Sequence, residues 1–228
     1  MQTSAIIPAL NEQETIANVV RAVPKTICQQ IIVVDNGSTD ATAERAAAAG
    51  ARVVKEPRRG YGRACAAGVG ALASDCEIVV FLDGDGSDCP ELMDLLVNPI
   101  AEERYDFVIG SRTLGVREAG SMNFQQVVAG RGAGFLVHKL YGVRYTDMCP
   151  FRAIRRGALE QLGMREMTYG WNLEMQMRAA GAKLRILEIP INHRRRAGGT
   201  SKVSGSVRGT CLAATRIALT LARVAWER

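Results

Sequence analysis

The chain has 228 residues, of which 47% are hydrophobic and 23% charged, values that are typical of a globular domain and exclude a disordered, collagen-like or disulfide-stapled chain. Lysine and arginine total 29 against 23 aspartate and glutamate residues, a net charge of +6 that suits an anionic substrate or a membrane surface. Only 5% of residues are aromatic and no basic run is interleaved with them, so nucleic acid is not an expected partner.

Short apolar runs alternate with helical patterns over the first half of the chain. The predicted strands are residues 4–7, 31–34, 52–55, 78–82 and 107–109. The predicted helices run from a capping box of Asn11 and Glu14 to about residue 23, from a cap at Asp40 to Gly50, over 64–72, and over 90–103. Strands that alternate with helices in this way indicate an α/β fold with a parallel, doubly wound sheet.

The second half is less regular. The predicted elements are a helix over residues 127–140, a strand over 151–154, a helix over 172–180 and a strand over 184–189. A loop of arginine, glycine and serine over 194–206 then leads to a last helix. The six cysteines are scattered, which predicts neither a zinc site nor a disulfide framework. The sequence shows no signal peptide and no apolar run long enough to span a bilayer, so we expect a cytoplasmic protein.

Two acidic loops follow predicted strands, at residues 35–40 and 83–88. Because the carboxyl ends of parallel strands meet at one edge of the sheet, both loops should open onto one crevice. Asp83 and Asp85 are separated by a glycine that lets both carboxylates face one point, and such hard oxygen ligands suit Mg²⁺ or Mn²⁺. The alternative is a polar turn whose aspartates cap the next helix, and this is the preferred interpretation for Asp88.

The motifs in these loops resemble, in order, those of family 2 glycosyltransferases. The segments are 8–12 (PALNE), 33–40 (VVDNGSTD) and 83–85 (DGD), continued by 109–112 (IGSR), 150–152 (PFR) and 196–202 (RAGGTSK). The most similar subgroup is the dolichyl- or polyprenyl-phosphate sugar transferases. The resemblance implies a GT-A fold in which residues 1–205 form one catalytic domain. Residues 1–111 would bind the nucleotide sugar and 112–205 would face the acceptor, followed by a C-terminal helix over 206–228.

The same resemblance implies a nucleoside-diphosphate sugar as donor. Pro8, Leu10 and Glu12 would line the nucleoside pocket, and Asp35 would meet the base or ribose. Asp83 and Asp85 would hold the diphosphate through Mg²⁺ or Mn²⁺, with Ser87 in the position of a further, weaker ligand. The glycine-rich stretch 58–63 resembles one that family members carry before their third helix, and it predicts a turn near the substrate.

Transfer of the sugar develops negative charge on the leaving diphosphate, which cations stabilise. Arg112, Arg196 and Lys202 are the predicted cations, and Asp85 contributes through the metal. A polyprenyl phosphate acceptor is already ionised and needs no base, whereas a hydroxyl acceptor does. Glu174 is the candidate base for that case, with an exposed helix glutamate as the equally weighted alternative.

Residues 206–228 predict a helix of mixed character. Ile217, Leu221 and Val224 share one face, and the other face carries Arg208, Leu212, Arg216, Leu219, Arg223 and Trp226. Arginine mixed with leucine and tryptophan is typical of a peripheral contact with an anionic membrane. The alternative is a helix that packs on the domain or in a homodimer.

Two other functions remain open from the sequence. The loop at residues 82–87 also resembles that of haloacid-dehalogenase-like phosphatases, in which Asp83 would be the nucleophile and Asp85 the acid/base. That loop normally follows the first strand, whereas here at least two strand–helix units precede it. The second alternative is a non-catalytic protein that binds a sugar nucleotide without transferring it.

Overall fold

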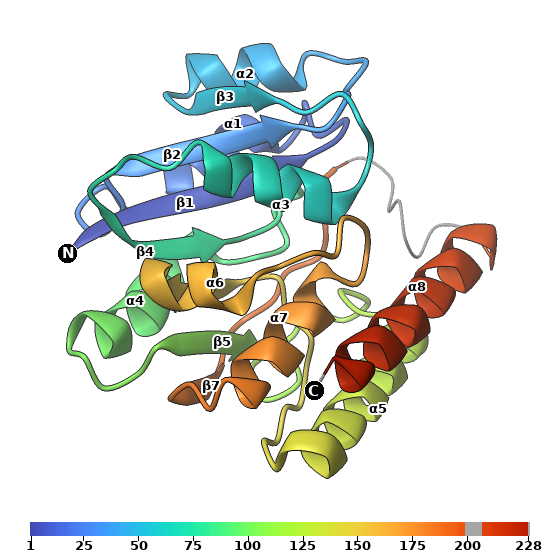
Figure 1. Ribbon diagram of the computed structural model, residues 1–228. Helices are drawn as coiled ribbons and strands as arrows, with labels where there is room; N and C mark the ends of the chain where they lie inside the picture. The colour runs from blue at the N-terminus through green and yellow to red at the C-terminus, as the bar shows by residue number, and fades with distance from the viewer. Residues whose placement is uncertain (199–206, 228) are drawn as a thin grey trace.

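The computed structural model describes residues 1–198 and 207–227. Its seven strands form one sheet in the order β3-β2-β1-β4-β6-β5-β7 (Figure 1). The strands are β1 (Gln2–Ala9), β2 (Gln30–Asp35), β3 (Arg52–Lys55), β4 (Cys76–Phe81), β5 (Phe107–Ser111), β6 (Arg152–Arg155) and β7 (Ile186–Pro190). All neighbours are parallel except β6, which is antiparallel to β4 and β5. The expected α/β fold with a mostly parallel sheet is confirmed.

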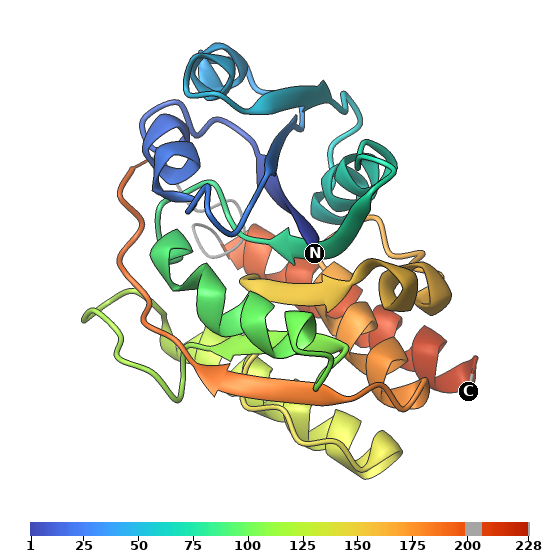
Figure 2. The same ribbon diagram turned by 90° about the vertical axis from the view of Figure 1, so that its left-hand side faces the viewer.

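Helices cover both faces of this sheet. They are α1 (Ile16–Ala22), α2 (Thr42–Ala48), α3 (Tyr61–Gly70), α4 (Met93–Ala101), α5 (Phe124–Tyr141), α6 (Arg156–Leu162), α7 (Trp171–Gly181) and α8 (Val207–Trp226), with a 3-10 turn η1 (Pro90–Leu92) before α4. Figure 2 shows α1 and α4 on one face and α3 and α6 on the other. Because the central strands are covered on both sides, β1, β2 and β4 carry continuous apolar runs instead of an alternating pattern.

The largest difference from the predicted topology is the position of β6. This strand comes from the second half of the chain, yet it pairs with β4 on one side and β5 on the other. The predicted strands of residues 1–111 therefore do not form a continuous parallel sheet by themselves. Helix α6, which directly follows β6, was not predicted. Its seven residues are too few to show a helical period clearly.

The predicted helix caps in the first half are wrong in detail. Helix α1 begins at Ile16 without a side-chain cap. Asn11 instead adopts a φ of +52°, and its Oδ1 accepts a hydrogen bond from the N–H of Thr39 at 2.8 Å. Asp40 lies two residues before the start of α2 and accepts from the N–H of Thr42 at 3.0 Å. Asp40 Oδ2 also accepts the N–H of Gln13 at 3.3 Å, so both side chains join the loop after β1 to the loop after β2.

The C-terminal helix packs on the domain. Helix α8 lies against α7, and Tyr141 Oη at the end of α5 donates to Val224 O. Val224 is buried and Ile217 and Leu221 are partly buried, as the predicted apolar face requires. On the other predicted face, Arg216, Leu219 and Trp226 are exposed. Arg223 instead pairs with buried carboxylates of the domain. The side chains of Arg208 and Leu212 lie outside the described part of the chain. Within residues 1–198 and 207–227, no helix is both long and apolar enough to cross a bilayer.

Candidate active site

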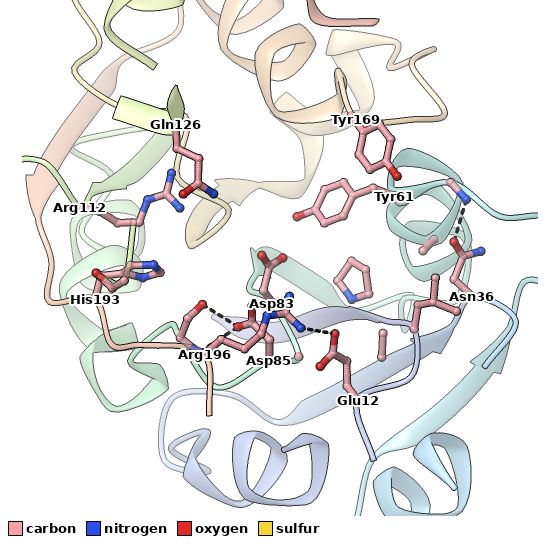
Figure 3. A pocket seen from close by; sticks show the side chains of 18 of the residues that line it. Glu12, Asn36, Tyr61, Asp83, Asp85, Arg112, Gln126, Tyr169, His193 and Arg196 are labelled. Atoms are coloured by element: carbon pink, nitrogen blue, oxygen red, sulfur yellow. Dashed lines mark hydrogen bonds and ion pairs between the residues drawn. The ribbon is translucent and has the colours of Figure 1, made fainter. Parts of the chain in front are cut away.

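The loops after β1, β2 and β4 lie side by side at one edge of the sheet, because these neighbouring strands run parallel. They border a cleft of about 660 Å³ that the start of α3, the start of α5 and the segment after β7 complete (Figure 3). Its charged and polar lining includes Glu12, Asn36, Arg59, Tyr61, Asp83, Asp85, Arg112, Gln126, Tyr169, His193 and Arg196. Carboxylates and arginines from distant parts of the chain thus share one space.

The turn after β4 presents two carboxylates to the cleft, as predicted. Gly86 has the left-handed φ of +77° that the tight turn requires. Asp85 Oδ1 accepts hydrogen bonds from the N–H and the hydroxyl of Ser87, at 2.9 and 2.6 Å. Thr15 Oγ1 donates to Gly84 O at 2.7 Å and holds the turn against the start of α1. Ser87 therefore orients Asp85.

Asp83 points into the open part of the cleft (Figure 3). Burial raises the pKa of its carboxyl group well above the ordinary value, and the nearby charges of Asp85 and Asp88 raise it further. Arg112 and Arg196 oppose this shift without cancelling it. A cation beside Asp83 would relieve the crowding of negative charge in this turn.

Asp88 does not cap the following helix, so the preferred interpretation from the sequence is wrong. The turn η1 has Cys89 at its N-cap position and no side-chain cap. Asp88 is buried, and its Oδ2 accepts the N–H of Asp83 at 2.9 Å. Its Oδ1 has no hydrogen-bond partner among the described residues and lies 3.8 Å from Nδ1 of His193. Burial raises the pKa of Asp88 to about 7, and burial together with Arg112 lowers that of His193 to about 4.

Arg196, one of the predicted cations, lies in the cleft and pairs with two of its carboxylates. Its two terminal nitrogens pair with Glu12 Oε1 at 2.8 Å and Asp85 Oδ2 at 2.9 Å. The N–H of Ala197 donates to Asp85 O at 3.1 Å, which holds the segment after β7 along the acidic turn. Lys202 lies outside the described residues.

Arg112 also lines the cleft, held by a carboxylate that the sequence did not reveal. Its Nε and Nη2 donate to the two carboxylate oxygens of Asp147 at 2.7 and 2.8 Å, a bidentate pair. Burial alone would raise the pKa of Asp147, but hydrogen bonds and the charge of Arg112 hold it below the ordinary 3.8. Glu188 on β7 in turn accepts the N–H groups of Thr146 and Asp147 at 2.9 and 3.2 Å. The position of Arg112 thus depends on residues 146–147 and on β7.

Of the residues predicted to bind the nucleoside, three line the cleft and one does not. Pro8, Leu10 and Glu12 line it, but Asp35 is not among its lining residues. Asp35 Oδ1 instead accepts the N–H of Ser38 at 2.9 Å. The following residue, Asn36, lines the cleft and fixes the turn 56–60 through both ends of its amide. The strand pattern placed the acidic loop correctly but could not show which of two adjacent side chains faces the cleft.

The glycine-rich stretch 58–63 forms one wall. Arg59, Gly60 and Tyr61 line the cleft where α3 begins. Gly60 has a φ of +149°, and a Cβ there would lie 2.3 Å from Met167 O, so only glycine fits. Tyr61 Oη is buried without a hydrogen-bond partner in the described residues, and Figure 3 shows it directed into the cleft. The predicted turn near the substrate is therefore part of the cleft wall.

Glu174 is not placed to act as a base in this cleft. It is fully buried on α7 and is not one of the lining residues. Its Oε2 accepts the N–H groups of Arg165 and Glu166 at 2.9 and 2.6 Å, and its Oε1 pairs with Arg178 and Arg223 at 3.0 and 3.1 Å. Glu174 therefore joins α7, the segment before it and α8. Neither alternative from the sequence, a base or an exposed glutamate, fits this position.

The donor set fits a divalent cation that is shared with a substrate. Among the described residues, no group of three or more histidine, cysteine, aspartate or glutamate side chains is arranged to hold a metal. Asp83 and Asp85 alone would leave most of the coordination to phosphate oxygens and water, which is the usual way that Mg²⁺ and Mn²⁺ are bound with nucleotides.

Comparison with known proteins decides the family. The model described as Glycosyl transferase family 2 matches residues 4–163, well over half of the chain. The chain belongs to glycosyl transferase family 2. An uncharacterized glycosyltransferase of Mycobacterium tuberculosis is 39% identical to this family 2 glycosyltransferase over 217 residues, covering 92% of this chain and 93% of the relative. The polyprenol monophosphomannose synthase of Mycolicibacterium smegmatis is 30% identical over 221 residues, covering 90% and 82%.

A solved structure shares the fold of this family 2 glycosyltransferase. Glucosyl-3-phosphoglycerate synthase of Mycobacterium tuberculosis, crystallised with Mn²⁺, uridine-diphosphate-glucose and phosphoglyceric acid, superposes with a TM-score of 0.75 at 23% identity, covering 98% of this chain and 79% of that one. This confirms the GT-A fold. Family membership also confirms that the chain is a glycosyltransferase, and it argues against the phosphatase alternative.

Proposed function

We propose that this glycosyltransferase moves a sugar, with inversion, from a nucleoside-diphosphate sugar to a polyprenyl phosphate. The observation that carries the proposal is the convergence of Asp83, Asp85, Arg112 and Arg196 on one cleft at the carboxyl edge of the sheet. In the proposed reaction an acceptor oxygen forms a bond to the anomeric carbon while the bond from that carbon to the diphosphate breaks. A single displacement of this kind inverts the anomeric configuration.

Charge on the leaving diphosphate must be stabilised. Asp83 and Asp85 would hold Mg²⁺ or Mn²⁺, which acts as a Lewis acid on the phosphate oxygens when it is bound. Arg196 pairs with Glu12 and Asp85 in this structure. When the nucleotide sugar and the metal bind, Arg196 would release Asp85 and pair with a phosphate oxygen instead. Arg112 would keep its bidentate bond to Asp147, which fixes the guanidinium in place. Its remaining N–H groups would then stabilise the negative charge on the leaving diphosphate.

The groups around the cleft favour an acceptor that is already ionised. Glu12 and Asp85 are bound by Arg196, and Asp83 and Asp85 are the proposed metal ligands. His193, whose pKa is lowered to about 4 by burial, is a weak base for a sugar or glycerol hydroxyl. A phosphate acceptor needs no proton removed. The name of the relative from Mycolicibacterium smegmatis, a polyprenol monophosphomannose synthase, is consistent with this acceptor class.

Calorimetry of nucleotide binding tests the donor site. Uridine and guanosine diphosphates are titrated into the wild-type chain with and without Mn²⁺, and into Asp83→Asn. We expect one of them to bind with Mn²⁺, and Asp83→Asn to weaken that binding about tenfold or more. Asp75→Asn is the matched control, because Asp75 is exposed just before the opposite end of β4. Equal binding by wild type and Asp83→Asn would overturn the metal assignment.

A transfer assay tests the acceptor. The donor sugar that belongs to the bound nucleotide is incubated with a short-chain polyprenyl phosphate or with a hydroxyl acceptor such as phosphoglycerate. We expect transfer to the polyprenyl phosphate, in a product of inverted configuration. Transfer to the hydroxyl acceptor alone would overturn the acceptor class, and tight nucleotide binding without transfer to either acceptor would favour the non-catalytic alternative.

A further inference from the structure

Helix α5 exposes an apolar face with no partner in the described residues. At 100° per residue, Phe124, Val128, Arg131, Phe135 and Lys139 fall within one narrow stripe, here named the α5 face. Phe124 is 81% exposed and Phe135 is 59% exposed, although phenylalanine is usually buried. The other three phenylalanines of the chain are all buried, so the exposure is specific to this helix. Three exposed apolar side chains that share one stripe of a helix indicate an interaction surface.

The charges on this helix select the kind of partner. Helix α5 contains no aspartate or glutamate, and the α5 face carries the exposed cations Arg131 and Lys139. Lys139 Nζ lies 5.7 Å from the centre of the Phe135 ring, so cation and aromatic group are mixed within the face. Lysine and arginine beside phenylalanine are typical of helices that lie in the headgroup region of anionic bilayers.

A second copy of this chain would fit the α5 face poorly. In a two-fold symmetric contact the same patch meets itself, so Arg131 and Lys139 of both copies would approach one another. The helix offers no carboxylate to compensate them, and like charges brought together without partners are unfavourable. Anionic headgroups supply the missing negative charge, and acyl chains accept the phenylalanines.

The opposite side of α5 fixes this face relative to the cleft. Gly134 packs so closely on the domain that a Cβ there would lie 2.0 Å from Tyr145 O. Asn123 caps the helix through a reciprocal capping box with Gln126, and both residues line the cleft. Phe124 lies between them in the chain. The exposed apolar face therefore begins at the mouth of the cleft and is held rigidly to it.

We propose that the α5 face docks this enzyme on the surface of an anionic lipid bilayer, with the mouth of the cleft at the level of the headgroups. Phe124, Val128 and Phe135 would enter the acyl boundary, and Arg131 and Lys139 would pair with lipid phosphates. The value of this orientation for catalysis rests on the proposed polyprenyl phosphate acceptor, whose phosphate would reach the cleft from the bilayer. The docking itself does not depend on that acceptor.

Vesicle co-sedimentation tests the docking. The full chain is mixed with vesicles of phosphatidylcholine and phosphatidylglycerol, or of phosphatidylcholine alone. We expect wild type to bind the anionic vesicles, and the double variant Phe124→Ser/Phe135→Ser to bind about tenfold or more weakly. The double variant Arg131→Gln/Lys139→Gln should lose the preference for anionic vesicles. Leu95→Ser is the matched control, an exposed apolar residue of α4 on another side of the domain.

Undiminished vesicle binding by the phenylalanine variant would overturn the docking. So would a wild-type dimer in size-exclusion chromatography that this variant converts to a monomer, because the second copy would then be the occupant. Nucleotide binding and transfer to a short, water-soluble polyprenyl phosphate separate this proposal from the proposed function. The phenylalanine variant should retain both, whereas failure of the proposed function would abolish transfer in the wild type as well.

Discussion

Replacement of Glu174 by alanine tests whether this residue is structural or catalytic. The substitution leaves the N–H groups of Arg165 and Glu166 without their acceptor in a buried position, at about 1–3 kcal/mol for each. The two arginines that pair with Glu174 keep other carboxylates, Arg178 with Glu227 at 2.6 Å and Arg223 with Glu166 at 3.3 Å. Loss of their ion pairs with Glu174 therefore adds little to the cost. We expect the free energy of unfolding to fall by about 3–5 kcal/mol.

Urea unfolding followed by circular dichroism gives this free energy, with transfer kinetics measured on the same preparation at a temperature where the variant is folded. The specificity constant, kcat/KM, should stay within about twofold of wild type, because the side chain is outside the cleft. Glu174→Gln should lose less stability than the alanine variant, since its amide oxygen can still accept the two N–H groups.

Glu160→Ala is the control for this series. Glu160 forms an exposed pair with Arg156 on α6, and its removal should cost less than about 1 kcal/mol. A Glu174→Ala variant with wild-type stability but a transfer rate about 100-fold lower or more would refute the structural interpretation. It would favour the predicted role of Glu174 as a catalytic base.

Three further outcomes follow from the contacts described. Asp147→Asn should destabilise the chain by about 3–5 kcal/mol at pH 7, because Arg112 loses its buried partner. Since the pKa of Asp147 is lowered in the folded state, its contribution is present above the ordinary value of 3.8 and is lost as the pH falls below it. The stability gap between this variant and wild type should therefore narrow as the pH falls below 3.8, and a constant gap would contradict the linkage. Gly62→Ala would place a Cβ 2.1 Å from the backbone oxygen of Glu166, which should lower the free energy of unfolding by about 1–3 kcal/mol and weaken nucleotide binding. An unchanged melting temperature together with unchanged nucleotide affinity in calorimetry would contradict this. Burial raises the pKa of the Cys65 and Cys149 thiols well above 9.0, so iodoacetamide should label them only after unfolding, as read by mass spectrometry.

Much of the structure of residues 1–111 could be predicted from local patterns. Runs such as residues 31–34 and 78–82 are long enough and sufficiently β-branched to be recognised as buried strands. The parallel order then brings the loop at Asp83 and Asp85 to the loops after β1 and β2 without further information. Family resemblance indicated Arg196, far away in the chain, as a cation for the leaving diphosphate, and the structure places its side chain against Asp85.

The remaining features depend on tertiary contacts that periodicity does not encode. Nothing in residues 152–155 shows that the strand runs antiparallel between β4 and β5. Asp88 has the local sequence of a helix cap, but burial beside the backbone of Asp83 determines its role. Glu174 has the sequence pattern of an exposed helical residue until α8 covers it. In each case a distant segment, not the local propensity, decides what the side chain contacts.

The insertion of β6 has a consequence for the order in which the chain can assemble. During synthesis β5 leaves the ribosome more than 40 residues before its partner β6 is complete, and its other neighbour β7 follows later still. We therefore expect a truncated chain that ends at residue 111 to keep β5 as an unpaired segment with buried-type apolar residues exposed, and to aggregate. Residues 1–111 and the later part of the chain are therefore joined within the sheet by β6, and a chimera that exchanges either part would have to keep β6 paired with β4 and β5.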